Sequence, residues 1–157
     1  MARDDFVARY GGVYEHSPWV AEAVFDDGGA PAPADLAARM AAVVDTAPRS
    51  RQLDLIRAHP DLAGRAAVAG ELTAESSDEQ RSARLDLCTP EEYQRFQSLN
   101  AAYHDKFGFP FVMAVRNSNR AEILAAFERR LANDREAEFA TALREIHTIA
   151  RLRLEAM

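Results

Sequence analysis

The feature that most constrains the fold is the repeated pairing of helix-start signals with apolar residues three or four positions apart. Leu36, Met40, Val43 and Val44 recur at this spacing, which places them on one face of an amphipathic helix. Helices are predicted over residues 6–10, 18–25, 35–46, 49–58, 79–87, 89–106 and 121–131, and from residue 134 onward. Their predicted start residues are Ser17 before Pro18, Thr89 before Pro90, Ser118 or Asn119, and Asp134. The pattern predicts an all-α fold, a helical bundle.

One segment, residues 107–115, does not follow the helical pattern. Its sequence, Phe-Gly-Phe-Pro-Phe-Val-Met-Ala-Val, has the composition of a strand. A lone strand has no partner in a helical protein, and Pro110 cannot donate a ladder hydrogen bond. We therefore expect an extended, largely buried segment within the bundle. Its irregular backbone has N–H and C=O groups that need partners.

The bulk properties exclude several classes of protein. The length of 157 residues suits one compact domain, so residues 1–157 are predicted to form a single domain. A net charge of −6 argues against a nucleic-acid partner. No apolar run approaches the roughly 20 residues of a membrane span, and the N-terminus lacks an apolar signal core. We expect a cytoplasmic protein with no membrane association.

Metal and thiol chemistry are also disfavoured by the sequence. No histidine has another histidine or a carboxylate three or four positions away, as a metal site in a helical bundle would need. Cys88 is the only cysteine, so no internal disulfide is possible. Its predicted place near the end of a helix disfavours a reactive thiolate. We expect no metal site and no cysteine nucleophile.

Two short motifs carry groups suited to acid and base chemistry. His59 precedes Pro60, which stiffens the backbone, and a histidine changes charge near neutral pH. The second motif, Ser76-x-x-Glu79-Gln80, supplies a carboxylate that can give or take a proton. Plainer interpretations exist, because His59 can be a surface loop residue and Ser-x-x-Glu is also a helix capping box. The two motifs alone leave both interpretations open.

Taken together, the motifs resemble one known family. They are Tyr14-Glu15-His16-Ser17-Pro18-Trp19-Val20, His59-Pro60-Asp61-Leu62-Ala63, Ser76-x-x-Glu79-Gln80, Leu99-Asn100-x-x-Tyr103, Phe107-Gly108-Phe109-Pro110-Phe111 and the run from Ile149 to Leu154. In this order they resemble the 2-oxo-4-hydroxy-4-carboxy-5-ureidoimidazoline (OHCU) decarboxylase family over nearly the whole chain. The resemblance implies an all-α homodimer without a cofactor. It also implies decarboxylation of an anionic ureidoimidazoline to (S)-allantoin and carbon dioxide in urate degradation.

The resemblance also implies roles for particular residues. The catalytic residues it implies are His59, Glu79 and Gln80. The substrate-binding residues it implies are Pro60, Ser76, Phe109, Phe111, Val112, Met113, Ala114, Val115 and Arg153, the segment from 109 through its backbone. Arg151 is the alternative to Arg153, and either His59 or Glu79 can deliver the proton.

The chemistry agrees with a cofactor-free reaction. Loss of carbon dioxide leaves an electron pair that the ring C=N and carbonyl groups can delocalise, so the protein needs only to orient the carboxylate, stabilise charge and deliver one proton. Two alternatives stay open. One is a non-catalytic helical interaction module that docks through the Phe109 region, which would leave that segment exposed as an apolar patch. The other is a hydrolase of a related ureido compound, which would need a positioned water.

Overall fold

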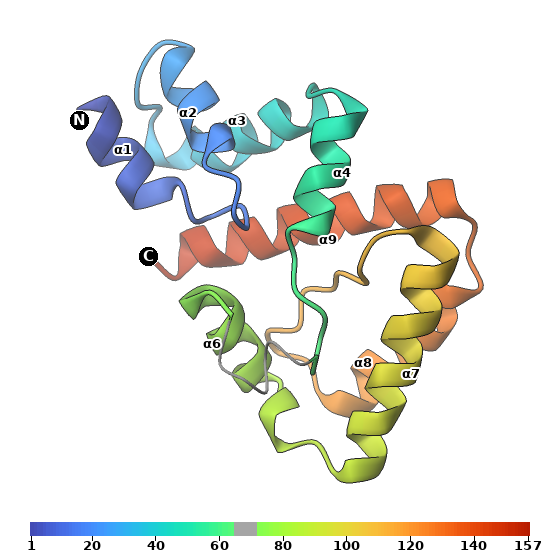
Figure 1. Cartoon of the computed structure of the whole chain (residues 1–157). Helices are drawn as coiled ribbons and strands as arrows, with labels where there is room; N and C mark the ends of the chain where they lie inside the picture. The colour runs from blue at the N-terminus through green and yellow to red at the C-terminus, as the bar shows by residue number, and fades with distance from the viewer. Residues whose placement is uncertain (65–71) are drawn as a thin grey trace. The chain divides into compact units, whose positions relative to one another are not determined.

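The computed structural model describes residues 1–64 and 72–157, which form two compact units. The first unit contains Met1–His59 and Ile146–Met157, and the second contains Pro60–Glu145. Every regular element in the described residues is a helix, which confirms the predicted all-α class (Figure 1). None of these helices has the length and apolar content needed to cross a membrane.

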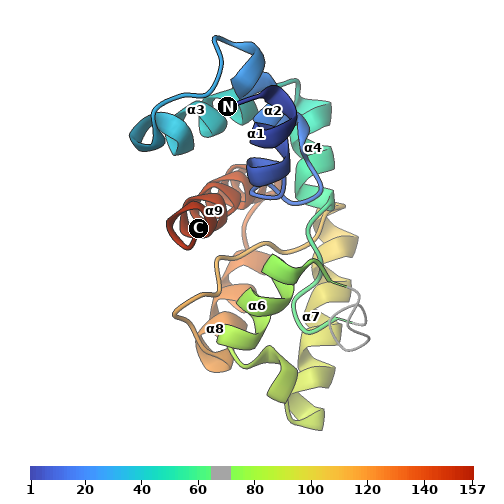
Figure 2. The ribbon, with the colours of Figure 1, turned by 90° about the vertical axis from the view of Figure 1, so that its left-hand side faces the viewer.

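The first unit is built from short helices. They are α1 (Arg3–Tyr10), α2 (Trp19–Asp26), α3 (Pro33–Asp45), α4 (Arg49–Arg57) and the part of α9 (Arg135–Glu155) from Ile146 onward. Helix α2 packs against both α1 and α3, and α1 and α2 lie side by side in Figure 2. The core consists of the buried apolar side chains Phe6, Val20, Val24, Met40, Val44, Leu55, Ile56 and Ile146.

The second unit has an aromatic core. It contains α6 (Ala74–Ser82), the 3₁₀ turn η1 (Leu85–Leu87), α7 (Pro90–Phe107), α8 (Arg120–Leu131) and α9 as far as Glu145. Helix α7 packs against α8 (Figure 2). The Phe111 ring stacks on Phe127 with centroids 3.9 Å apart, and Tyr103 contacts both rings edge-on. Aromatic packing of this kind adds to the apolar area that the core removes from water.

Three predicted helix starts are confirmed by their caps. Thr89 and Glu92 form a reciprocal capping box, with a Glu92 N–H to Thr89 Oγ1 distance of 3.1 Å and a Thr89 N–H to Glu92 Oε1 distance of 3.0 Å. Asn119 Oδ1 accepts from the Glu122 N–H at 2.9 Å, and Asp134 Oδ1 accepts from the Ala137 N–H at 2.8 Å.

The predicted cap at Ser17 is wrong. Pro18 takes the N-cap position of α2, and no side chain caps that helix. Ser17 Oγ instead donates to the Glu15 carbonyl at 2.8 Å. The side chain therefore stabilises the turn before the helix rather than the helix itself.

The helix predicted over 79–87 has different bounds, and the capping-box interpretation of Ser76-x-x-Glu79 is wrong. The N-cap of α6 is Thr73, whose Oγ1 accepts from the Ser76 N–H at 3.1 Å, so Ser76 and Glu79 both lie within the helix. The helix ends at Ser82, because Arg84 adopts a left-handed conformation with φ of 59°. Glu79 is consequently not a capping residue.

The predicted extended segment is confirmed. Gly108 ends α7 in the left-handed conformation that glycine adopts without strain, with φ of 76°, and residues 109–115 have neither helix nor strand structure. Phe109 and Phe111 are each 1% exposed, and Val112 and Val115 are buried. This burial removes the exposed aromatic patch that the docking-module alternative required.

Candidate active site

His59 lies two residues after the end of α4 in the first unit and is buried. Its Nδ1 lies 2.9 Å from the Leu55 carbonyl oxygen. A carbonyl oxygen can only accept, so Nδ1 carries the proton and Nε2 keeps its lone pair. Burial lowers the pKa of His59 to about 4. The effect of burial outweighs those of the Leu55 hydrogen bond and the Glu15 carboxylate, which both raise this pKa. Near neutral pH the side chain is therefore an uncharged proton acceptor with a fixed tautomer.

A buried ion pair lies in the same unit. Arg153 Nη2 is 3.3 Å from Glu15 Oε2, and Arg153 Nη1 donates to the carbonyls of Gly12 and Val13 at 3.2 and 3.4 Å. Both charges act on His59, since Glu15 raises its pKa and Arg153 lowers it. The pair places an arginine and a carboxylate within electrostatic reach of the histidine.

The two candidate arginines of α9 differ in their surroundings. Arg153 is 5% exposed, whereas the side chain of Arg151 is 60% exposed and pairs with Glu155 at 3.8 Å. A solvated arginine contributes little to a specific interaction. Burial therefore supports Arg153 over Arg151 as the arginine of a binding site.

Sequence reasoning missed a chain of side-chain contacts that holds Tyr14, the residue before Glu15. Tyr14 Oη lies 2.7 Å from His147 Nδ1, and His147 Nε2 lies 2.9 Å from Asp45 Oδ1. Burial raises the pKa of Tyr14, so its hydroxyl stays protonated. This chain of contacts fixes the backbone next to Glu15. The only available signal was the Tyr14-Glu15-His16 motif, to which no role was assigned.

The lowered pKa of His59 predicts how the stability of the fold depends on pH. An unfolded histidine has its ordinary pKa of 6.5, and the folded value is about 4, so between these values the unfolded chain binds a proton that the folded chain does not. This contribution to stability is complete above the unfolded pKa and decreases as the pH falls toward the folded pKa, by at most about 1.4 kcal/mol per pH unit. Urea unfolding of wild type and His59→Asn across this window measures it. The variant is expected to lose less stability on acidification, and equal losses would contradict the assignment.

Three predicted site residues lie on one face of α6 in the second unit. Ser76, Glu79 and Gln80 are three and four positions apart, and all are buried. The Gln80 amide has a structural role that the sequence did not reveal. Its Nε2 donates to the Asp61 carbonyl at 3.1 Å, and its Oε1 accepts from the Ala63 N–H at 3.0 Å.

The loop that contains Pro60 is held by further amides from α7. Asn100 Nδ2 donates to the Leu62 carbonyl at 3.0 Å, and Gln97 Nε2 donates to the Ala63 carbonyl at 2.7 Å. Ala63 itself adopts a φ of 52°, which a non-glycine residue keeps only where its surroundings enforce it. The backbone that follows His59-Pro60 is therefore fixed at successive residues.

A cavity of about 430 Å³ lies beside α6 in the second unit. Its lining includes Ser77, Gln80, Arg81 and Cys88, but neither Ser76 nor Glu79. Cys88 donates to the Leu85 carbonyl at 3.2 Å, and burial raises the pKa of its thiol, so the thiolate is disfavoured as expected. The cavity therefore meets the candidate residues only at Gln80.

The described residues contain no group of three or more histidine, cysteine or acidic side chains arranged to hold a metal ion. The chemistry available to them is instead that of a neutral histidine, buried carboxylates, a buried arginine and amides.

The family model described as OHCU decarboxylase matches residues 1–155. The chain belongs to the OHCU decarboxylase family. Among its relatives, the 2-oxo-4-hydroxy-4-carboxy-5-ureidoimidazoline decarboxylase of Haloferax volcanii is 48% identical over 151 residues, which cover 96% of this chain and 88% of that protein. The protein of the same name from Halalkalicoccus jeotgali is 45% identical and covers 99% of this chain and 86% of its own length. The family predicted from the motifs is thus confirmed.

A solved structure supports the fold of this OHCU decarboxylase family member. The crystal structure of an (S)-allantoin synthase superposes with a TM-score of 0.78 at 36% identity. The match covers 99% of this chain and 50% of that chain, so this chain spans about half of that protein.

Proposed function

We propose that this chain decarboxylates 2-oxo-4-hydroxy-4-carboxy-5-ureidoimidazoline to (S)-allantoin and carbon dioxide, a step of urate degradation. Family membership supports the reaction class. The observation that carries the proposal is the buried, uncharged His59 with a hydrogen-bonded Nδ1 and an unprotonated Nε2. Such a side chain suits proton transfer near neutral pH.

The substrate itself supplies the electron sink. When the bond from C4 to the carboxylate breaks, its electron pair forms a C4=C5 double bond, and the C5=N pair moves to nitrogen, which takes up a proton. The 4-hydroxyl then loses its proton as the C4 carbonyl forms, and C5 gains a proton. The reaction consumes one proton overall and requires no external oxidant, metal or cofactor.

The proposed roles follow this electron flow. His59 accepts the proton of the 4-hydroxyl through Nε2, and Glu79 delivers a proton to one face of C5, which sets the (S) configuration. Arg153 binds the anionic substrate. The other contacts implied by the resemblance are Pro60, Ser76, Gln80 and the backbone from Phe109 to Val115.

The alternative as a hydrolase of a related ureido compound makes a different product. A hydrolase would add water and keep every carbon of the substrate, whereas the proposed reaction releases one carbon dioxide per turnover. Freshly prepared substrate, with a label in its carboxylate, separates the two. We expect labelled carbon dioxide and allantoin in equal amounts, and a product that retains the label would overturn the proposal.

Substitution of the two α9 arginines tests the substrate-binding role. Arg153→Lys keeps the charge beside Glu15 but loses the planar fork that can contact several acceptors. We expect KM to rise by roughly 10- to 100-fold, as for loss of a hydrogen bond to a charged group. Arg151→Lys is the matched control and is expected to leave steady-state kinetics unchanged. Equal KM values in both variants would contradict the role of Arg153.

Chelation tests the cofactor-free mechanism. Because the substrate ring delocalises the electron pair, we expect prolonged dialysis against EDTA to leave kcat and KM unchanged. The control is the same protein dialysed without chelator. Activity that is lost on chelation and restored by one divalent ion would contradict the mechanism.

We also propose that residues 1–157 act as one domain, as the chain length suggests, and that the protein is cytoplasmic and, as the resemblance implies, a homodimer. Sedimentation equilibrium measures the mass, for which twice the chain mass of 17.4 kDa is expected.

A further inference from the structure

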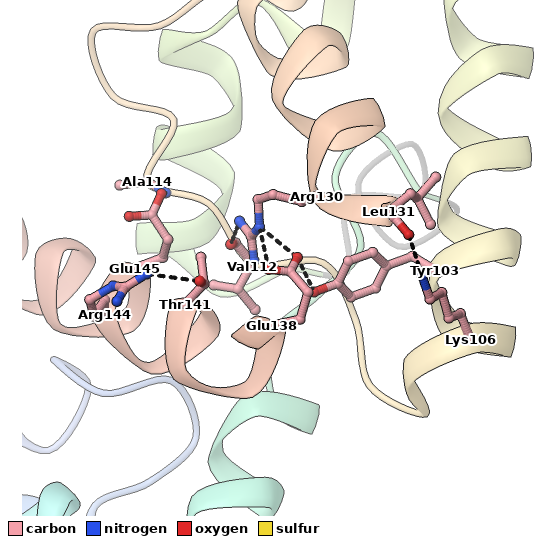
Figure 3. Close-up of polar contacts among 10 residues, drawn as sticks. All are labelled: Tyr103, Lys106, Val112, Ala114, Arg130, Leu131, Glu138, Thr141, Arg144 and Glu145. Carbon is pink, nitrogen blue, oxygen red and sulfur yellow. Dashed lines mark hydrogen bonds and ion pairs between the residues drawn. The ribbon is translucent and has the colours of Figure 1, made fainter. Parts of the chain in front are cut away.

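A buried charged cluster in the second unit has no part in the roles described so far. Glu138 of α9 is fully buried, and its Oε1 accepts from Arg130 Nε at 2.8 Å and from Tyr103 Oη at 2.9 Å (Figure 3). Arg130 of α8 is 9% exposed. Three helices thus each contribute one member of the cluster.

Stability alone does not account for the buried ion pair between Arg130 and Glu138. Removing two charges from water is costly, and well-packed apolar residues often replace a buried ion pair without loss of stability. The pair in addition leaves Arg130 Nη2 buried without a hydrogen-bond partner among the described residues. We therefore expect Arg130 to have a role that an apolar side chain cannot perform.

The contacts of Arg130 identify that task. Its Nη1 donates to the Val112 carbonyl at 2.6 Å, and its guanidinium lies over the Phe111 ring, 4.3 Å from the centroid. One side chain thus holds both a ring and a backbone group of the extended segment. The segment has no helix or strand ladder to fix its backbone, so side chains must do so.

Neighbouring side chains hold the same segment elsewhere. Arg135 Nε donates to the Phe107 carbonyl at 3.1 Å, and Glu145 Oε1 accepts from the Ala114 N–H at 3.4 Å (Figure 3 shows the second contact). Arg130 contacts the segment between these two points, and the fully buried carboxylate of Glu138 fixes Arg130 itself. The Arg130–Glu138–Tyr103 cluster is therefore the central support of the segment.

We propose that Arg130 is a positioning residue, which with Glu138 and Tyr103 fixes the backbone of residues 111–113 for substrate binding. The inference rests on the proposed function, in which the backbone from Phe109 to Val115 contacts the substrate. Arg130 acts through this backbone and not on the reacting atoms. A single guanidinium contacts both the Glu138 carboxylate and the Val112 carbonyl, so a change in the cluster acts directly on the backbone of the segment.

Two variants separate positioning from folding. Arg130→Lys keeps the charge opposite Glu138 but cannot donate to both Glu138 and Val112 through a rigid fork. The double variant Arg130→Met with Glu138→Gln removes both charges together, so neither is left buried and unpaired. Arg129→Lys, on the exposed face of α8, is the matched control.

The readouts are steady-state kinetics and hydrogen exchange of the amides of residues 111–115, each at a temperature where the variant is fully folded. In both cluster variants we expect exchange in the segment to increase roughly tenfold or more relative to α7, and KM to rise more than kcat falls. The control should match wild type in both.

The possible results are distinguishable. Unchanged exchange in the segment of both folded cluster variants would overturn the positioning role. Increased exchange with unchanged KM would overturn its link to the substrate. If wild type releases no carbon dioxide, the proposed function fails, and the exchange measurement alone still decides whether Arg130 fixes the segment.

Discussion

Replacement of His59 by asparagine is expected to reduce decarboxylation by roughly 100- to 10,000-fold, the range typical of losing a general acid or base. The imidazole supplies the only unprotonated nitrogen assigned to proton transfer, and asparagine cannot accept and return a proton there. The fold is expected to survive, because asparagine is smaller and carries no charge into the buried site. The melting temperature should fall by only a few degrees.

The control for this variant is His16→Asn. His16 is exposed and adopts a φ of 47°, a conformation that asparagine tolerates well. His16 is a minor cause of the low pKa of His59, and burial, the largest cause, is unchanged in this variant, so turnover should stay at the wild-type level. If His59→Asn turned over at a near-normal rate with a normal melting curve, His59 would return to the role of a buried structural histidine.

Replacement of Glu79 by glutamine should reduce the rate by roughly 100-fold or more, as for removal of a general acid. The sequence alone allowed Glu79 to be a capping residue, but Thr73 caps α6 and Glu79 lies within the helix. Glutamine has nearly the same shape and a similar helix propensity, so the free energy of unfolding should change by less than about 1 kcal/mol. Allantoin released by the variant should show eroded handedness, since solvent can then protonate either face.

Glu75→Gln provides the comparison within the same helix. Glu75 is exposed in the first turn of α6. Its replacement makes the same change of a carboxyl group to an amide as Glu79→Gln does, and is expected to change neither rate nor handedness. A Glu79→Gln enzyme that is fast and still makes only the (S) product would exclude Glu79 as the proton donor.

The sequence predicted the helices well where the start signal is local. The Thr89–Glu92 box and the Asn119 cap involve residues within three positions of each other, so their pattern is visible in the chain. The prediction failed at α6, because the Thr73 hydroxyl lies three positions before Ser76 and takes the N-cap role itself. The left-handed conformation of Arg84 has no residue signature, since glycine or asparagine would be expected there.

The candidate site could be predicted only in part, for a related reason. The sequence motifs identified His59, Glu79 and Arg153 as candidate site residues. They did not show which groups surround these side chains. The pairing of Arg153 with Glu15 joins positions 138 apart in the chain, and the neutral state of His59 depends on its burial. Long-range contacts of this kind arise from packing and leave no periodic pattern in the sequence.

The most direct test of the proposed function is circular dichroism of the product made from freshly prepared OHCU. We expect wild-type protein to produce the signal of (S)-allantoin faster than the spontaneous reaction, and the signal to reach the full amplitude of a single enantiomer. Racemic allantoin formed at the uncatalysed rate would contradict it.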